Sequence, residues 1–434
     1  MKKIVKIFIL YFIFIQCVFG TGTQISLVSD TEIENFLKEI SLPILKSAGL
    51  DYNNVKFYIV NDSSINAFVM GGQNIFVNTG TLTSFDEPDA ILGIIAHEVG
   101  HISGGHLARA NQDLSSTNAI TIGSILLGIG ALIAGVPEVG QAIIMGSAHV
   151  QQQTVLKYTR TQEESADALA ITYLNENKMS SEALLKSMQK FYLNELQYSN
   201  EMEYFSTHPL SRNRKQFIEN KMKSENYDNE NFNKKYGVEF NFIKAKILAY
   251  NKTNGVGNIV DVNGDYKVYA DSILNMNNNK INEALRQVDY LIEKYKTNPY
   301  FFELKGDIFL KKNDVKNALV NYKKADEIIK DNTLIKKMIA FIIIKYKQKN
   351  MYNEAINNLN YVIQKDKTDI SALKLLAEAY YNNGDVALSY LTLAEYYVNI
   401  KDFKKANNYI KLASENTKDK NILSKIEDLK LSLK

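Results

Sequence analysis

The fold is organised around the stretch Ile94-Ile95-Ala96-His97-Glu98-Val99-Gly100-His101. His97 and His101 are four residues apart, so on a helix both imidazoles lie on one face, one turn apart. Two imidazoles in this arrangement can bind one metal ion, and zinc is the usual occupant. Glu98 lies beside the pair, where a carboxylate can accept a proton from water. The apolar run 90–96 predicts a buried helix that presents the site at its end.

The alternative interpretation is two histidines on the surface of a helix beside a glutamate. The distribution of histidine along the chain weighs against that alternative. The chain has five histidines, and all of them lie within about one quarter of its length: His97, His101, His106, His149 and His208. The stretch therefore predicts a zinc peptidase with one Zn²⁺ per chain.

Length, charge and cysteine content limit the other classes of protein. A chain of 434 residues suggests two or three domains with ample room for a core. The net charge of +3 is nearly balanced and argues against a dedicated nucleic-acid binder. The single cysteine is Cys17, and residues 1–20 are a predicted leader peptide. A mature chain without that leader would have no disulfide, no cysteine zinc site and no thiol nucleophile.

The N-terminal residues 1–20 have the pattern of a secretory signal peptide. Basic residues come first, then the apolar run 7–14, then the small-residue end Val18-Phe19-Gly20. The alternatives are an N-terminal helix that stays as an anchor and a lipoprotein attached at Cys17, although the residues before Cys17 are bulky. The signal peptide and the anchor both place the chemistry outside the cytoplasm.

A hairpin is predicted just before the metal-binding helix. Residues 66–80 contain two short strands around the turn Gly71-Gly72. The strand Ala67-Phe68-Val69-Met70 can hold a substrate backbone by strand addition if it lies at the edge of the sheet. An ordinary hairpin without this role is the equally weighted alternative.

A catalytic zinc needs about three protein ligands and one open position. His106 follows His101 by five residues, whereas the metzincin pattern needs six, so His106 is the weaker candidate. Glu163 is the better one, in a helical stretch where Asp167 shares its face. Asp167 can accept the ring N–H of a ligand histidine. The alternative for these two carboxylates is an acidic turn on the surface.

These motifs together resemble the metallopeptidase family that includes the CAAX prenyl protease and HtpX, and most of all its periplasmic, BepA-like branch with tetratricopeptide repeats. The residues that carry the resemblance are Asn66-Ala67-Phe68, Gly71-Gly72, His97-Glu98-Val99-Gly100-His101, Thr159-Arg160, Glu163, Ala166, Asp167, Thr207-His208-Pro209 and Arg214. The match runs from about residue 30 to the C-terminus. Thr159 stands where serine is commoner in the family.

The resemblance implies a gluzincin in which His97, His101 and Glu163 bind zinc and Glu98 is the general base. It also implies that His208 approaches the zinc site. There His208 either donates to the oxyanion or fills the open zinc position and keeps the enzyme idle, and a loop histidine without a role is the alternative. Arg214 either anchors that loop or pairs with a carboxylate. No chemistry is assigned to His149.

Residues 119–148 are strongly apolar and lie between the ligands. A single membrane span there would leave His101 and Glu163 on opposite sides of a bilayer, where one zinc ion cannot use both. We therefore predict a buried lid or a hairpin that touches the membrane peripherally. A two-helix insertion like that of HtpX is the alternative.

The C-terminal part of the sequence contains a repeat. Ala284, Ala318, Ala355 and Ser389 are spaced by 34, 37 and 34 residues, close to the ~34 of tetratricopeptide repeats. Stacked helix pairs of this kind form a concave surface that suits a polypeptide. A generic helical bundle is the alternative.

The sequence thus predicts an α+β fold, in which a mainly helical gluzincin domain with a small β-sheet precedes an all-α tetratricopeptide-repeat solenoid. The predicted division is a signal peptide at 1–20, a peptidase domain at 24–225, a linker at 226–263 and repeats at 264–434.

The resemblance implies a zinc endopeptidase of the bacterial periplasm that hydrolyses unfolded or misassembled outer-membrane proteins. Its expected partners are polypeptide substrates and, through the repeats, the outer-membrane protein assembly machinery. The alternative is a chaperone or scaffold for that assembly with gated or minor proteolysis. A non-peptidase zinc hydrolase fits less well, because an edge strand and a protein-binding array suit polypeptides.

Overall fold

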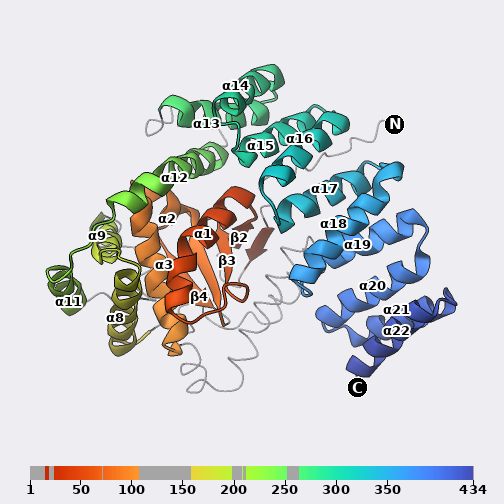
Figure 1. The fold of residues 1–434 in the computed structure, drawn as a ribbon, viewed down its shortest axis with the longest axis horizontal. Coiled ribbons are helices and arrows are strands. Elements are labelled where there is room, and N and C mark those ends of the chain that lie inside the picture. The colour runs from red at the N-terminus through yellow and green to blue at the C-terminus, as the bar shows by residue number, and fades with distance from the viewer. Residues whose placement is uncertain are drawn as a thin grey trace. The chain divides into compact units, whose positions relative to one another are not determined.

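The computed structural model describes residues 15–18, 24–70, 72–106, 158–197, 208, 212–251 and 263–433 (Figure 1). The described chain divides into two compact units, one up to Leu274 and one from Asn275 onward.

The first unit contains a five-stranded sheet. Its strands are β1 (Ile15–Val18), β2 (Gln24–Val28), β3 (Lys56–Val60), β4 (Ala67–Met70) and β5 (Asn74–Asn78), in the spatial order β1-β2-β3-β5-β4. The pair β3 and β5 is parallel, and the other neighbouring pairs are antiparallel. Strand β1 falls within the predicted leader, and β4 is the edge strand at the opposite side of the sheet.

Strands β4 and β5 form the predicted hairpin, in which Phe68 lies opposite Phe76 and Met70 opposite Asn74. Gly72 lies in the turn with φ +99°, a left-handed conformation that glycine adopts without steric cost. Successive side chains alternate between the two faces of a strand. Ala67 and Val69 therefore point into the apolar core, and Phe68 on the other face stacks on Phe76 with ring centroids 5.0 Å apart.

Helices cover the core face of this sheet. The helices of the first unit are α1 (Thr31–Ser47), α2 (Thr79–Ser84), α3 (Pro88–Ser103), α8 (Arg160–Glu176), α9 (Glu182–Gln197), α11 (Arg212–Met222), α12 (Glu230–Asn251) and α13 (Gly264–Asn277), of which α13 runs across the boundary between the units. Helix α1 packs against β3, and α3 packs against β4, α8 and α9 (Figure 1). Helix α3 thus lies at the centre of the unit.

Helix α12 occupies most of residues 226–263, which the sequence predicts as a linker. Tyr236, Phe240, Ile243 and Ile247 recur at intervals of three or four residues and are buried in the same core as α1 and α3. The ring of Phe240 stacks on Phe36 of α1 with centroids 5.7 Å apart. The polar Asn and Lys residues between them lie outside this stripe, so α12 packs as part of the first unit.

The second unit is wholly helical in its described residues. Its helices are α14 (Ile281–Lys294), α15 (Pro299–Lys311), α16 (Val315–Ile328), α17 (Thr333–Lys345), α18 (Tyr352–Lys365), α19 (Ile370–Asn383), α20 (Val386–Asn399), α21 (Phe403–Glu415) and α22 (Lys420–Ser432), with the short 3₁₀ helix Lys349–Met351 before α18. Each helix packs against the next in the chain. Together the two units confirm the predicted α+β class, a mainly helical domain with a small sheet followed by an all-α region.

The spaced small residues of the predicted repeat occupy the contacts between these helices. Ala284, Ala318 and Ala355 are completely buried, and Ser389 is nearly so. At Gly306 of α15 a Cβ atom would lie 2.8 Å from the ring of Tyr322 in α16, so only glycine allows this approach. Assignment of the array to tetratricopeptide repeats stays a prediction, which these contacts support.

Among the described residues, no helix is both long enough and apolar enough to cross a lipid bilayer. The apolar segment 119–148, with its predicted lid or membrane contact, lies outside the described residues, and so does His149.

Candidate metal centre

Helix α3 carries His97, Glu98 and His101. Pro88 at its first position and Asp89 in its first turn favour the start of a helix there. All its residues from Pro88 to His101 are buried, and the three site residues are at most 1% exposed. The predicted helix therefore exists, and it places both imidazoles on one face inside the protein.

Helix α8 brings two carboxylates to this face. Thr159 caps the helix, and its hydroxyl accepts a hydrogen bond from the backbone N–H of Gln162. Glu163 and Asp167 follow one turn apart and are completely buried. The two helices approach closely at Gly100, where a Cβ atom would lie 2.6 Å from the backbone oxygen of Ala166.

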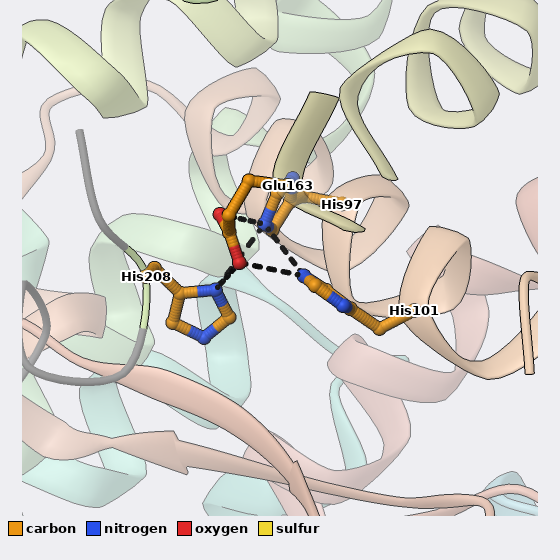
Figure 2. A group of neighbouring side chains, drawn as sticks. All are labelled: His97, His101, Glu163 and His208. Atoms are coloured by element: carbon orange, nitrogen blue, oxygen red, sulfur yellow. Dashed lines mark hydrogen bonds and ion pairs between the residues drawn. The ribbon is translucent and has the colours of Figure 1, made fainter. Parts of the chain in front are cut away.

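Four donor side chains converge from three separate stretches of the chain: His97, His101, Glu163 and His208 (Figure 2). Their donor atoms all lie within 4.8 Å of one another. His97 Nε2 is 3.1 Å from His101 Nε2 and 3.4 Å from His208 Nδ1. Glu163 Oε1 is 3.0 Å from His208 Nδ1 and 3.2 Å from His101 Nε2.

This donor set fits zinc. Zinc prefers histidine nitrogens and carboxylate oxygens in a tetrahedron, with ligand bonds of about 2.0–2.2 Å, which puts neighbouring donors about 3.3 Å apart. Four of the separations between these donors are 3.0–3.4 Å, which matches that spacing. The Nε2 atoms of His97 and His101 face each other inside the protein, which is the arrangement expected when both bind one cation.

Glu98 lies outside the four donors. His208 Nε2 is 3.7 Å from Glu98 Oε1, and within the described part of the chain neither Glu98 oxygen has a hydrogen-bond partner. Burial raises the pKa of Glu98 above its ordinary value of 4.5. A carboxylate with a raised pKa is suited to taking up a proton and passing it on.

The outer nitrogens of the two helix histidines also have partners. His97 Nδ1 lies 2.9 Å from Asp167 Oδ1, so the carboxylate accepts the ring N–H and leaves Nε2 free to bind a metal. His101 Nδ1 lies 3.0 Å from His106 Nδ1, which can accept the N–H of His101 in the same way. His106 is therefore not among the four donors, in line with its weaker standing as a ligand.

Arg214 of α11 pairs with both carboxylates of α8. Its Nη1 is 2.6 Å from Glu163 Oε2, and its Nε is 2.6 Å from Asp167 Oδ2. Of the two roles that the sequence left open for Arg214, the structure shows the pairing with carboxylates. Thr207 and Pro209, which flank His208, lie outside the described residues.

Charge pairing inside this site shifts several pKa values. Burial alone lowers the pKa of His97, but hydrogen bonds to Asp167 and Glu163 outweigh it and raise the pKa to about 10. Burial raises the pKa of Asp167, but Arg214 outweighs it and lowers the pKa below 3.8. For His101 burial dominates, and its pKa falls well below 6.5.

Two neighbours of the site were not found by sequence reasoning. His106 was weighed only as a ligand, although Gly105 after the helix, with φ +64°, turns the chain back toward His101. Tyr158 directly precedes the capping residue of α8, and its ring stacks on His101 with centroids 3.7 Å apart. The signal for Tyr158 was its place next to the helix cap.

Known proteins similar to this chain are named as proteases. Residues 30–222 match the model of peptidase family M48. Over 380 residues the chain is 25% identical to the "Beta-barrel assembly-enhancing protease" of Escherichia coli (strain K12), an alignment that covers 84% of this chain and 75% of that protein. It is 28% identical over 172 residues to "Metalloprotease LoiP" of the same organism, covering 40% of this chain and 64% of the relative.

A more distant relative is the "Mitochondrial metalloendopeptidase OMA1" of Schizosaccharomyces pombe, 21% identical over 184 residues that cover 42% of this chain and 51% of that protein. The matched range 30–222 contains all four donors and Glu98. Residues 30–222 of this chain are thus similar to peptidase family M48, and the chain is a zinc-dependent metalloendopeptidase.

Proposed function

We propose that His97, His101 and Glu163 are the zinc ligands of this peptidase and that Glu98 is its general base. The observation that carries the proposal is the convergence of these three donors at 3.1–3.3 Å, with Glu98 buried beside them. Asp167 and Arg214 act as support, because Asp167 orients His97 and Arg214 neutralises the two carboxylates of α8.

Zinc, when bound, polarises the peptide carbonyl and lowers the pKa of water. Glu98 then accepts a proton from the attacking water as the water oxygen bonds to the carbonyl carbon. When the C–N bond breaks, Glu98 returns that proton to the leaving amine nitrogen. Burial favours the protonated form of Glu98, which helps it to hold the proton between the two steps.

His208 closes the donor set in this structure. Its Nδ1 lies 3.0 Å from Glu163 Oε1 and 3.4 Å from His97 Nε2, within bonding range of a shared metal ion. A catalytic zinc site keeps one position open for substrate, whereas a site with four protein ligands is closed. We infer that His208 is the fourth ligand in this state, and that it must move aside before a peptide can bind.

The edge strand β4 is the proposed substrate-binding strand. Its partner on one side is β5, and among the described strands none pairs with its other side. It also packs against α3, the helix that carries Glu98. A polypeptide added along Ala67–Met70 would be held extended beside that helix.

The proposed substrates are unfolded or misassembled outer-membrane proteins in the bacterial periplasm. The name of the Escherichia coli relative, which the alignment covers for 75% of its length, supports this assignment, and so does the predicted signal peptide. The helices from α14 to α22 would bind the substrate or the assembly machinery as tetratricopeptide repeats.

The test compares zinc content and casein cleavage in the protein and in its Glu98→Gln variant. We expect about one zinc per chain in both proteins, and cleavage in the parent alone. Zinc binding without cleavage in either protein is the result expected if His208 keeps the site closed, and His208→Ala should then restore cleavage. Absence of zinc from both proteins would refute the proposal.

A chaperone or scaffold with gated proteolysis is the second candidate. The observation that favours it is the fourth donor, His208, because a site with four protein ligands leaves no position for a peptide carbonyl and would not cut a polypeptide bound elsewhere on the protein. Cells that carry the Glu98→Gln variant distinguish the two functions. A scaffold keeps its effect on outer-membrane assembly in this variant, and a protease loses it.

A further inference from the structure

Tyr158 lines the donor cluster, and the proposed chemistry does not yet use it. Its ring stacks on His101 at 3.7 Å between centroids with an interplanar angle of 25°. The same ring lies 5.2 Å from the ring of His208. Tyr158 is only 4% exposed, and its ring lines one side of the site.

The hydroxyl of Tyr158 has no hydrogen-bond partner among the described residues. Buried tyrosine hydroxyls usually have one, because an unpaired polar group inside a protein costs free energy. The contrast is Tyr173 of α8, which is 6% exposed and donates its hydroxyl to Ser103 Oγ at 2.8 Å. Within the described part of the chain, the Tyr158 hydroxyl therefore makes no contact that a phenylalanine would lose.

A tyrosine hydroxyl is protonated near neutral pH and can donate one hydrogen bond. Among the described residues the Tyr158 hydroxyl has no acceptor, so it can donate to a group that enters the site.

The acceptor would arrive with the substrate. If His208 moved aside, the carbonyl oxygen of a bound peptide would occupy its place among the donors, next to the ring of Tyr158. We propose that Tyr158 is a catalytic residue whose hydroxyl donates a hydrogen bond to that oxygen as it becomes negatively charged, which rests on the proposed function above. This assigns to Tyr158 the oxyanion contact that the sequence interpretation offered to His208.

The step balances without a further reactant. As the water oxygen bonds to the carbonyl carbon, the π electron pair moves onto the carbonyl oxygen and Glu98 takes one proton from the water. Tyr158 donates its hydrogen bond to the new oxyanion and keeps its own proton. When the carbonyl re-forms, the C–N bond pair leaves with nitrogen, which receives the proton from Glu98.

The experiment uses the full-length, zinc-loaded protein and its Tyr158→Phe variant, with Tyr173→Phe as the matched control. Casein cleavage gives kcat and KM. Calorimetry with N-phosphoryl-leucyl-phenylalanine, whose tetrahedral phosphorus imitates the oxyanion, gives an affinity in the His208→Ala background, where the fourth position is vacated. Zinc content and melting temperature are recorded for every variant.

We expect Tyr158→Phe to lower kcat and the affinity for the phosphoryl dipeptide by roughly 100-fold, the usual effect of removing one oxyanion donor. KM, zinc content and melting temperature should stay unchanged, because the ring and its stack on His101 remain. Tyr173→Phe should lower the melting temperature slightly and leave kcat unchanged.

Unchanged kcat and affinity in Tyr158→Phe would overturn the inference. So would a loss of activity that is matched by loss of zinc or of thermal stability, because the hydroxyl would then have a structural role. If neither the parent protein nor its His208→Ala variant cleaves casein, the proposed function itself fails. Cleavage that depends on Glu98 but not on Tyr158 refutes this inference alone.

Discussion

Arg214 and Asp167 form a buried bidentate ion pair, in which Nε lies 2.6 Å from Oδ2 and Nη2 lies 2.9 Å from Oδ1. The same guanidinium reaches Glu163 with its third nitrogen, so one cation serves both carboxylates of α8. Asp167 and Glu163 are completely buried, and Arg214 is 1% exposed. The orientation of α8 toward the histidines therefore depends on a residue of α11.

Replacement of Arg214 by methionine should destabilise the zinc-free protein by about 3–5 kcal/mol, because it leaves two buried carboxylates without their cation. Arg214→Lys should recover only part of this loss, since an ammonium group cannot form the bidentate pair. Urea unfolding measures both effects. The control is Lys215→Met at an exposed neighbouring position, which should change stability by less than about 0.5 kcal/mol. Equal unfolding of Arg214→Met and the parent would contradict this account.

Asp167→Asn should weaken zinc binding by about 10- to 100-fold, as is usual when the partner of a ligand histidine is removed. The physical reason is that His97 loses the carboxylate 2.9 Å from its Nδ1 and with it the fixed tautomer. Competition with a coloured zinc chelator measures the affinity. Glu164→Gln, an exposed acid of the same helix, should bind zinc like the parent. A similar loss of zinc affinity in both variants would show that net charge, and not the contact between Asp167 and His97, causes the effect.

Zinc binding near pH 7 should release about one proton from His97. Its pKa is raised to about 10 in the metal-free protein, so the ring is protonated at pH 7, whereas a ligand histidine must be neutral. Zinc affinity should therefore rise as the pH increases toward 10. Calorimetry in two buffers with different ionisation enthalpies counts the protons. Asp167→Asn removes a contact that raises the pKa, so this variant should release a smaller fraction of a proton.

The same group sets a pH dependence of stability for the metal-free protein. Because the folded pKa of His97 lies above its ordinary 6.5, its contribution is fully present below about pH 6.5 and is lost as the pH rises through 10. The contribution of Asp167, whose pKa is lowered, is present above pH 3.8 and is lost as the pH falls through its folded pKa. Urea midpoints between pH 5 and 10 should therefore decline toward the alkaline end. In a His97→Phe variant this alkaline decline should be smaller.

Gly100→Ala should destabilise the first unit by about 1–3 kcal/mol and weaken zinc binding. The added Cβ would lie 2.6 Å from the Ala166 oxygen, so α8 must move and carry Glu163 with it. Gly237→Ala in α12 is the opposite control, because nothing lies within 4 Å of its Cβ position. There the better helix propensity of alanine should stabilise the protein by about 0.5–1 kcal/mol. Stabilisation by both substitutions would show that the helices are not in tight contact at Gly100.

Local periodicity was enough to predict part of this site. The four-residue spacings of His97 with His101 and of Glu163 with Asp167 each place two side chains on one helix face, and the structure has both pairs on helices. The position of His208 was expected only from the family resemblance, because its 45-residue separation from Glu163 carries no periodic signal.

The contacts missed from the sequence depend on tertiary packing. His106 meets His101 because the chain reverses at Gly105 just beyond the end of α3, and a helix pattern does not extend past its last turn. Tyr158 stacks on His101 only once α3 and α8 are docked. Residues of α12 were predicted as linker because their composition is polar, although Phe240 and Ile243 occupy a buried stripe.

The wide separation of the four donors along the chain has a consequence for synthesis of the protein. His97 and His101 emerge from the ribosome 66 and 62 residues before Glu163, and His208 follows 45 residues after Glu163. No short fragment contains the complete donor set, so we expect tight metal binding only after α8 has folded onto α3. Peptidase activity is then expected only once the first unit has folded.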